Sequence, residues 1–148
     1  MIEWTHDVVN FHGKWHDITA AGINPLPVQR PIPIWIGAGA PASPVPPLAA
    51  LKRIGRLADG FFPMCPPDDT GREVLATVKR YAAEAGRDPA DLQVEGRIEL
   101  TGSPEDWLGQ MKAWEELEVE AISVGTARTD LSRPEEHIDA LKRFREIL

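Results

Sequence analysis

The sequence predicts a protein of the α/β class, in which parallel strands alternate with helices. Short apolar runs of about five residues, typical of strands buried on both faces, alternate with longer segments of helical periodicity. Proline and capping residues stand at the boundaries between these segments. With 148 residues, 43% hydrophobic and 26% charged, the chain suits one globular domain. We expect a single domain over residues 1–148, with a hairpin and arm in residues 1–30 and four βα units in residues 31–148.

The N-terminal segment predicts a β-hairpin followed by a connecting arm. Aromatic and β-branched residues between positions 4 and 18 flank Gly13, which is typical of a hairpin. Residues 20–33 contain Gly22, Asn24 and four prolines, and this composition favours an extended connection over a helix.

The first two βα units begin with apolar runs over residues 32–36 and 61–65, each of which predicts a buried strand. The prolines that follow the first run delay its helix until after Pro47. Residues 48–57 then have an apolar residue at every third position: Leu48, Leu51, Ile54 and Leu57. The second helix follows an N-cap supplied by residues 66–70 and ends at Gly86.

The last two units begin with contrasting strands. Residues 92–100 alternate between apolar and polar side chains, so one face, with Glu95, Arg97 and Glu99, should meet water, a barrel lumen or a partner. Ser103 and Pro104 then predict the start of a helix. Residues 121–125 form another apolar strand.

The final helix should open at Ser132-Arg133-Pro134-Glu135 as a capping box. Its expected apolar face consists of Ile138, Leu141, Phe144 and Leu148.

Charge and cysteine content exclude several classes of protein. Residues 75–148 carry 16 acidic and 10 basic side chains, and such an acidic surface argues against nucleic-acid binding. No apolar stretch reaches the roughly 20 residues of a membrane-spanning helix, and the N-terminus does not resemble a secretory signal. Cys65 is the single cysteine, which excludes an internal disulfide and a multi-cysteine zinc site. We therefore expect a cytoplasmic protein.

Six short motifs stand in order along the chain: Phe11-His12-Gly13-Lys14-Trp15, residues 24–29 (NPLPVQ), residues 31–37 (PIPIWIG), residues 57–63 (LADGFFP), residues 85–89 (AGRDP) and residues 102–106 (GSPED). Together they resemble the luciferase-like monooxygenases, which are TIM-barrel enzymes that use FMN or the deazaflavin F420.

The resemblance implies a partial TIM barrel. These motifs belong to the C-terminal half of a family member, so the chain should form four βα units of an eight-unit barrel, preceded by a β-hairpin arm. Four parallel strands cut from a closed barrel expose two edges and an apolar interior. We therefore expect a homodimer that closes an eight-stranded, two-fold barrel, or pairing with a separately encoded N-terminal half.

The resemblance also implies a function. The chain would be a flavin- or F420-dependent oxidoreductase of the monooxygenase type, acting on a small molecule once the barrel is assembled. The family's usual catalytic residues lie in the other half, so no catalytic residue can be assigned here. The alternative is a non-catalytic binding or scaffold module, or a truncated remnant of such an enzyme.

The candidate cofactor-binding residues follow the first strand: Gly37, Ala38, Gly39 and Ser43. In the family, two glycines at this strand end present backbone N–H groups to the cofactor phosphate. Glycines permit close approach, and a following helix N-terminus favours an anion. Here Ala38 replaces the second glycine, Gly39 is shifted by one residue, and Ser43 offers a hydroxyl.

Other patterns have weaker functional interpretations. The segment that starts at Gly37 loosely fits a dinucleotide fingerprint, but the required helix cannot start there. His12 and His16 are spaced for zinc only on a helix, so we expect no metal site. The Pro-x-x-Pro pattern in residues 41–47 could form a polyproline ligand, although a stiff spacer is the simpler interpretation.

Overall fold

The computed structural model describes residues 8–22, 25–40 and 42–148. The chain separates into two compact units, Met1–Pro33 and Ile34–Leu148. In the first unit, β1 (Val9–His12) and β2 (Asp17–Ala21) form the predicted antiparallel hairpin. The Gly13 amide donates to the His16 carbonyl at 2.9 Å and closes the hairpin turn. Residues 4–7 of the expected hairpin lie outside the described residues.

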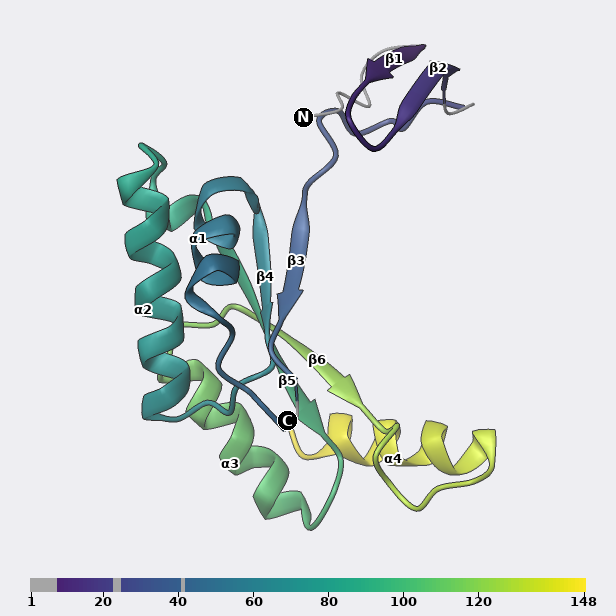
Figure 1. Cartoon of the computed structure of the whole chain (residues 1–148). Helices are drawn as coiled ribbons and strands as arrows, with labels where there is room; N and C mark the ends of the chain where they lie inside the picture. The colour runs from purple at the N-terminus through teal and green to yellow at the C-terminus, as the bar shows by residue number, and fades with distance from the viewer. Residues whose placement is uncertain (1–7, 23–24, 41) are drawn as a thin grey trace. The chain divides into compact units, whose positions relative to one another are not determined.

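The second unit is a four-stranded parallel sheet with helices between its strands (Figure 1). The strands are β3 (Trp35–Ala38), β4 (Gly60–Pro63), β5 (Gln93–Glu99) and β6 (Ala121–Gly125), in the spatial order β3-β4-β5-β6. The helices are α1 (Leu48–Leu57), α2 (Asp69–Glu84), α3 (Pro104–Glu115) and α4 (Pro134–Glu146), and a 3-10 turn η1 (Pro89–Asp91) precedes β5. The predicted α/β class and alternation of strands and helices are confirmed.

The first parallel strand begins later than predicted. The apolar run starts at Ile32, whereas β3 starts at Trp35. Pro33 has no N–H for a ladder, and the Ile34 amide donates to the Asp59 carboxylate at 2.7 Å instead. Asp59 therefore fixes the amino ends of β3 and β4, away from the carboxyl edge of the sheet.

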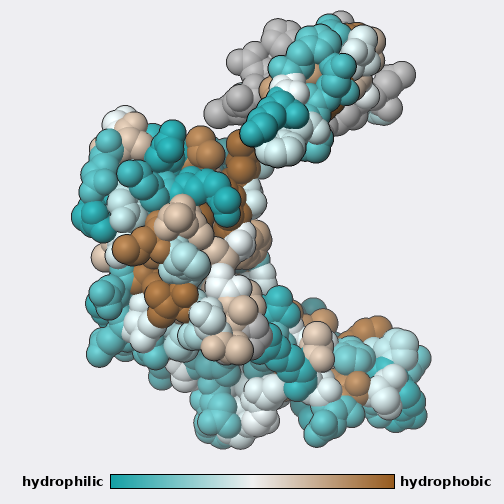
Figure 2. Space-filling model, in the orientation of Figure 1, coloured by the Kyte–Doolittle hydropathy of each residue, from teal (hydrophilic) through white to brown (hydrophobic). Residues whose placement is uncertain are grey.

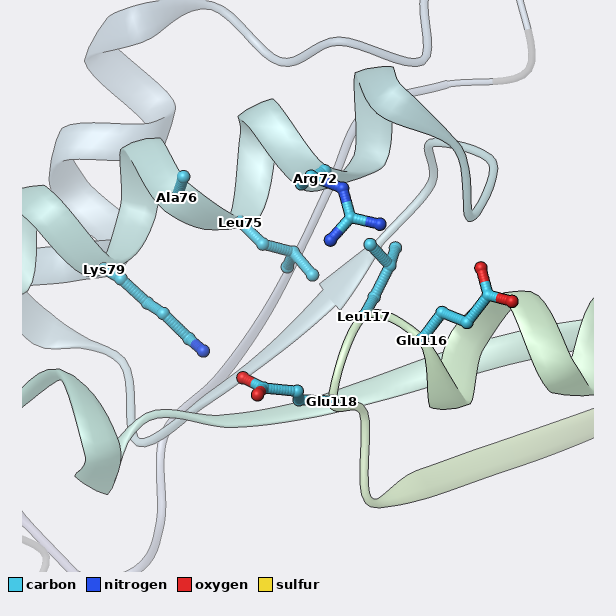
Figure 3. Close-up of a pocket in the computed structure, with 7 residues that line it drawn as sticks. All are labelled: Arg72, Leu75, Ala76, Lys79, Glu116, Leu117 and Glu118. Atoms are coloured by element: carbon cyan, nitrogen blue, oxygen red, sulfur yellow. The ribbon is translucent and has the colours of Figure 1, made fainter.

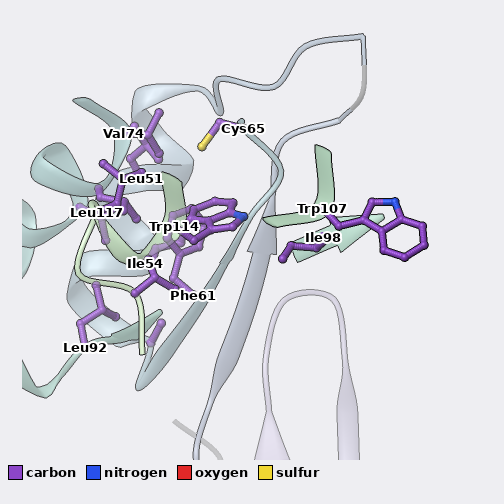
Figure 4. Close-up of a cluster of buried hydrophobic side chains, with 14 of the residues drawn as sticks. Leu51, Ile54, Phe61, Cys65, Val74, Leu92, Ile98, Trp107, Trp114 and Leu117 are labelled. Carbon is purple, nitrogen blue, oxygen red and sulfur yellow. The ribbon is translucent and has the colours of Figure 1, made fainter. Parts of the chain in front are cut away.

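The core lies between one face of the sheet and the helices (Figure 4). Trp114 of α3 is 1% exposed and covers Gly96 of β5, where an added Cβ would lie 2.7 Å from its ring. Its indole N–H donates to the Arg97 carbonyl at 3.1 Å. Cys65 is buried in the same core, as expected of a small apolar side chain.

Most helix starts follow the predicted capping chemistry. Asp68 accepts hydrogen bonds from the Thr70 and Gly71 amides at the start of α2, and Ser103 caps α3 with Asp106 in a capping box. The predicted capping box at the start of α4 is confirmed, with Arg133 and not Ser132 as the N-cap residue. Glu136 reaches back to accept from the backbone amides of both residues, so its carboxylate supplies the cap.

The predicted apolar face of α4 is mostly uncovered. Phe144 is buried, but Ile138 is 52%, Leu141 42% and Leu148 69% exposed. Similarly, α1 buries Leu51 and Ile54 and leaves Leu48 and Leu57 exposed. Among the described residues, α1 and α4 are the first and last helices along the sheet, and each therefore has a neighbouring helix on one flank alone. Figure 2 shows apolar patches at the surface of this unit.

Candidate functional site

The carboxyl ends of the four strands share one edge of the sheet because the strands are parallel. This edge is where α/β folds with parallel strands place their binding loops. The four strands end at Ala38, Pro63, Glu99 and Gly125. The candidate residues Gly37 and Ala38 are thus the last two residues of β3, and Gly39 and Ser43 belong to the loop that leaves this edge.

Gly39 needs to be glycine for two separate reasons. Its φ is +103°, a conformation that L side chains rarely adopt. An added Cβ would also lie 2.6 Å from the Pro44 carbonyl oxygen and 2.9 Å from the Met64 Cβ. A Cβ added to Gly37, in contrast, would lie 3.8 Å from the Phe62 Cβ, which is an ordinary van der Waals distance. The shifted glycine is therefore the one on which the shape of this loop depends.

A tight turn uses part of the donor capacity of the loop. The Ala40 amide donates to the Ser43 carbonyl at 3.0 Å, and the Ser43 amide donates back to Ala40 at 2.9 Å. Pro44, Pro46 and Pro47 have no N–H to offer. The amides of Gly39 and Ala42 donate to no backbone oxygen of the described residues, and the Ser43 residue is exposed. These amides and the Ser43 hydroxyl are the donors that remain for an anion.

Helix α1 begins nearby but has a weak N-terminal cap. The helix begins after Pro47, as predicted from the sequence. Pro47 occupies the N-cap position and makes no side-chain hydrogen bond there. The Ala50 and Leu51 amides both donate to the Pro47 carbonyl. The first amides of α1, at Leu48 and Ala49, therefore depend on solvent or a ligand for acceptors.

The face of the sheet opposite the core carries a polar row on β5, formed by Glu95, Arg97 and Glu99. Gly96 lies against Trp114, so these alternating neighbours point to the other face. The Arg97 Nε donates to Glu99 at 2.6 Å, and the Ser123 hydroxyl of β6 donates to Glu95. The strict alternation of apolar and polar residues over 92–100 predicted this polar face. The sequence did not reveal the hydrogen bond between Ser123 of β6 and Glu95.

One carboxylate oxygen of the polar row has no partner. Glu99 Oε2 is buried and has no hydrogen-bond donor among the described residues. An added Cβ on Gly125 would lie 2.7 Å from this oxygen and 2.8 Å from an Arg97 guanidinium nitrogen, so a side chain there would displace the pair. The Arg97 side chain remains 49% exposed.

The same face is apolar along β3 and β4. The rings of Trp35 and Phe62 lie with centroids 4.9 Å apart, and the Trp35 indole covers Gly60. The sheet therefore has an aromatic half and a charged half on its uncovered face. Parallel sheets ordinarily have both faces covered, whereas the described residues leave this face open.

The shifted pKa values that bear on structure arise from burial and capping. Burial raises the pKa of the Cys65 thiol, which favours its protonated form. A hydrogen bond from the Ser103 backbone amide lowers the pKa of Asp106, and one from the Ser132 amide lowers that of Glu136. Asp106 and Glu136 act as helix caps, and Cys65 has no evident nucleophilic role.

The histidines that the sequence singled out lie in the hairpin unit. His12 pairs with Asp17 across the two strands. Within the described ranges, no group of three His, Cys, Asp or Glu side chains is arranged to hold a metal ion. No helix among these residues is long and apolar enough to cross a bilayer.

A separate groove of about 260 Å³ lies on the helical side, between α2 and the turn after α3 (Figure 3). Arg72 and Lys79 project from α2 on one side, and Glu116 and Glu118 come from the end of α3 on the other. Glu118 has a φ of +58°, a left-handed backbone conformation that at helix ends usually favours glycine. This groove is not part of the carboxyl edge.

Comparison with known proteins identifies related sequences. The family model described as luciferase-like monooxygenase matches residues 3–100. An uncharacterized protein of Mycobacterium tuberculosis (strain ATCC 25618 / H37Rv) is 35% identical over 109 residues, which are 73% of this chain and 34% of that protein. The F420-dependent glucose-6-phosphate dehydrogenase of Amycolatopsis mediterranei is 34% identical over 92 residues, 62% of this chain and 24% of that enzyme.

A solved structure shares the fold. An F420-dependent secondary alcohol dehydrogenase, in complex with an F420-acetone adduct, superposes with a TM-score of 0.54 at 17% identity. The superposition covers 99% of this chain and 49% of the enzyme. The chain thus spans about a third of its mycobacterial relative and about half of this structural neighbour. Its four βα units correspond to half of a TIM barrel.

Proposed function

The chain belongs to the luciferase-like monooxygenase family, and from this premise we propose that it is the phosphate-binding half of an F420- or flavin-dependent oxidoreductase. The observation that carries the proposal is the position of Gly39 and Ser43, in the loop that follows β3, at the carboxyl edge of the parallel sheet. F420-dependent enzymes among its relatives favour F420, and FMN is the alternative cofactor.

The residues present fit the phosphate end of such a cofactor. Gly39 lets the backbone turn sharply at the strand end, and the Gly39 and Ala42 amides and the Ser43 hydroxyl supply donors for an anion. When bound, the cofactor would supply the chemistry, by exchanging a hydride with a small-molecule substrate. This chain would hold the cofactor's phosphate, and the opposite half of the barrel would surround the reacting ring.

The uncovered sheet supports completion of the barrel. Its outer strands β3 and β6 lack further strand partners among the described residues, and α1 and α4 both expose apolar side chains. An eight-stranded barrel would cover these edges and the open face together. We propose that the chain acts within such a barrel, completed either by a second copy or by an N-terminal half.

A phosphate-dependent titration tests the cofactor proposal. FMN should bind with saturable fluorescence quenching, riboflavin should bind at least about tenfold more weakly, and inorganic phosphate should compete with FMN. F420 and its phosphate-free chromophore form a second matched pair. Ser43→Ala should weaken FMN binding and leave riboflavin binding unchanged.

The second candidate is a non-catalytic module of the same fold. It is favoured by the Ala40–Ser43 turn, which uses two of the loop's amides for its own closure. The titration separates the two functions. No binding of FMN or F420 at high micromolar concentration would remove the oxidoreductase and leave a binding or scaffold module.

A further inference from the structure

The polar row on β5 restricts which set of strands can form the other half of the barrel. Its three inward side chains have the charge order negative, positive, negative at Glu95, Arg97 and Glu99. The interior of an eight-stranded barrel is only wide enough for side chains to fill. Charges on the row will therefore lie close to whatever side chains the opposite strand presents.

Symmetry decides what a second copy would present. In a barrel of two copies related by a two-fold axis along the barrel, the strand opposite β5 is the second copy's β5. Each inward residue then faces its own counterpart at the same height. Glu95 would face Glu95, Arg97 would face Arg97, and Glu99 would face Glu99, so every layer of this row would bring like charges together.

The contacts within the sheet do not cancel these charges. Ser123 donates a hydrogen bond to Glu95 but is neutral. Arg97 pairs with one oxygen of Glu99 and leaves Oε2 without a donor. Arg97 offsets the charge of Glu99 alone, so the negative charge of Glu95 remains as the excess of the row. A buried charge or acceptor without a partner is costly, and duplication of the chain would double this excess.

We propose that this barrel is completed by a half-barrel of different sequence. Its strand opposite β5 presents a hydrogen-bond donor to Glu95, an acidic side chain to Arg97 and a hydrogen-bond donor to Glu99. A second copy of this chain does not complete the barrel. The inference rests on the proposed function, because it takes the four strands as part of a barrel. A cationic or neutral donor facing Glu99 would also satisfy Oε2, since the terminal torsion of a glutamate is soft.

A chain with the reversed charge row provides the direct test. The variant Glu95→Lys/Arg97→Glu/Glu99→Lys is mixed with the wild-type chain, and the mass is measured by sedimentation and light scattering. We expect each protein alone to remain near the 16.4 kDa of one chain and the mixture to form a 1:1 complex. Association in the mixture should be at least about tenfold tighter than self-association of either protein.

A neutral variant guards against misfolding of the reversed one. Glu95→Gln/Arg97→Gln/Glu99→Gln should self-associate more strongly than the wild type, because the like-charge contacts are gone. The matched control, Glu73→Gln/Arg80→Gln/Glu84→Gln, makes the same changes of charge on exposed positions of α2 and should leave the mass unchanged. Circular dichroism checks that each variant keeps its fold.

A stable wild-type homodimer would overturn the inference while supporting barrel completion itself. The inference would also fail if neither the mixture nor the neutral variant associated more strongly than the wild type. The cofactor titration is independent of both results, so failure of the proposed function is recognised separately.

Discussion

Replacing Glu118 with glycine is expected to stabilise the fold. Glu118 follows α3 with a φ of +58°, and its amide donates to the Glu115 carbonyl at 2.9 Å. The Val119 amide donates to the Trp114 carbonyl at 3.2 Å, which completes the hydrogen-bond pattern of a Schellman helix end. The residue at Glu118 is exposed, so removal of its side chain opens no cavity.

The expected gain follows from two opposing contributions. Left-handed backbone costs a non-glycine residue about 1–2 kcal/mol, and the greater freedom of glycine in the unfolded chain takes back about 0.5–1 kcal/mol. The net gain in unfolding free energy is therefore about 0.5–1 kcal/mol. With a urea m-value of about 2 kcal/mol/M, the midpoint should rise by about 0.3–0.5 M.

Two control variants isolate the backbone effect. Glu118→Ala removes the same charge but keeps a Cβ, so it should gain little. Glu116→Gly places glycine at a residue with a φ of −64°, where it should lower stability by up to about 1 kcal/mol. Urea denaturation followed by circular dichroism measures all three. If Glu118→Gly were no more stable than Glu118→Ala, the reasoning about left-handed strain would be refuted.

Two further predictions concern packing and capping. Gly96→Ala should destabilise the protein by about 1–3 kcal/mol because its Cβ would meet the Trp114 ring. Gly109→Ala, in open space on α3, should instead stabilise it by about 0.5–1 kcal/mol. Thermal denaturation compares the two variants, and equal effects would contradict this packing. The Asp106 cap should stabilise the fold fully above the ordinary aspartate pKa of about 3.9 and progressively less as pH falls through the lower folded pKa. Asp106→Asn should reduce this loss of stability at acid pH, as measured by calorimetry between pH 2 and 6. An unchanged loss of stability would assign the pH dependence to other groups.

The sequence predicted the fold where local chemistry and periodicity agreed. Helix α1 begins directly after Pro47 because proline cannot donate within a helix, and α3 begins where Ser103 and Pro104 supply its cap. The alternation along β5 correctly indicated a strand with one polar face. These features depend on residues close in the chain, which is why they could be read directly.

Features that depend on distant residues were harder to predict. Asp59 binds the Ile34 amide across 25 positions and so shifts the start of β3. Ile138 and Leu141 follow helical periodicity, yet their exposure depends on a neighbour that α4 lacks within the described chain. At the candidate site, the glycines were found from the sequence, but the mutual hydrogen bonds of Ala40 and Ser43 required the structure.

Backbone amide chemical shifts during a titration with FMN test the central claim most directly, because they report on the loop at the carboxyl edge of β3. The claim predicts saturable shifts at Gly37, Gly39 and Ala42 with FMN and with inorganic phosphate, and much smaller shifts with riboflavin. Equal shifts with FMN and riboflavin, or shifts confined to the groove beside Glu118, would contradict a phosphate-binding role for this loop.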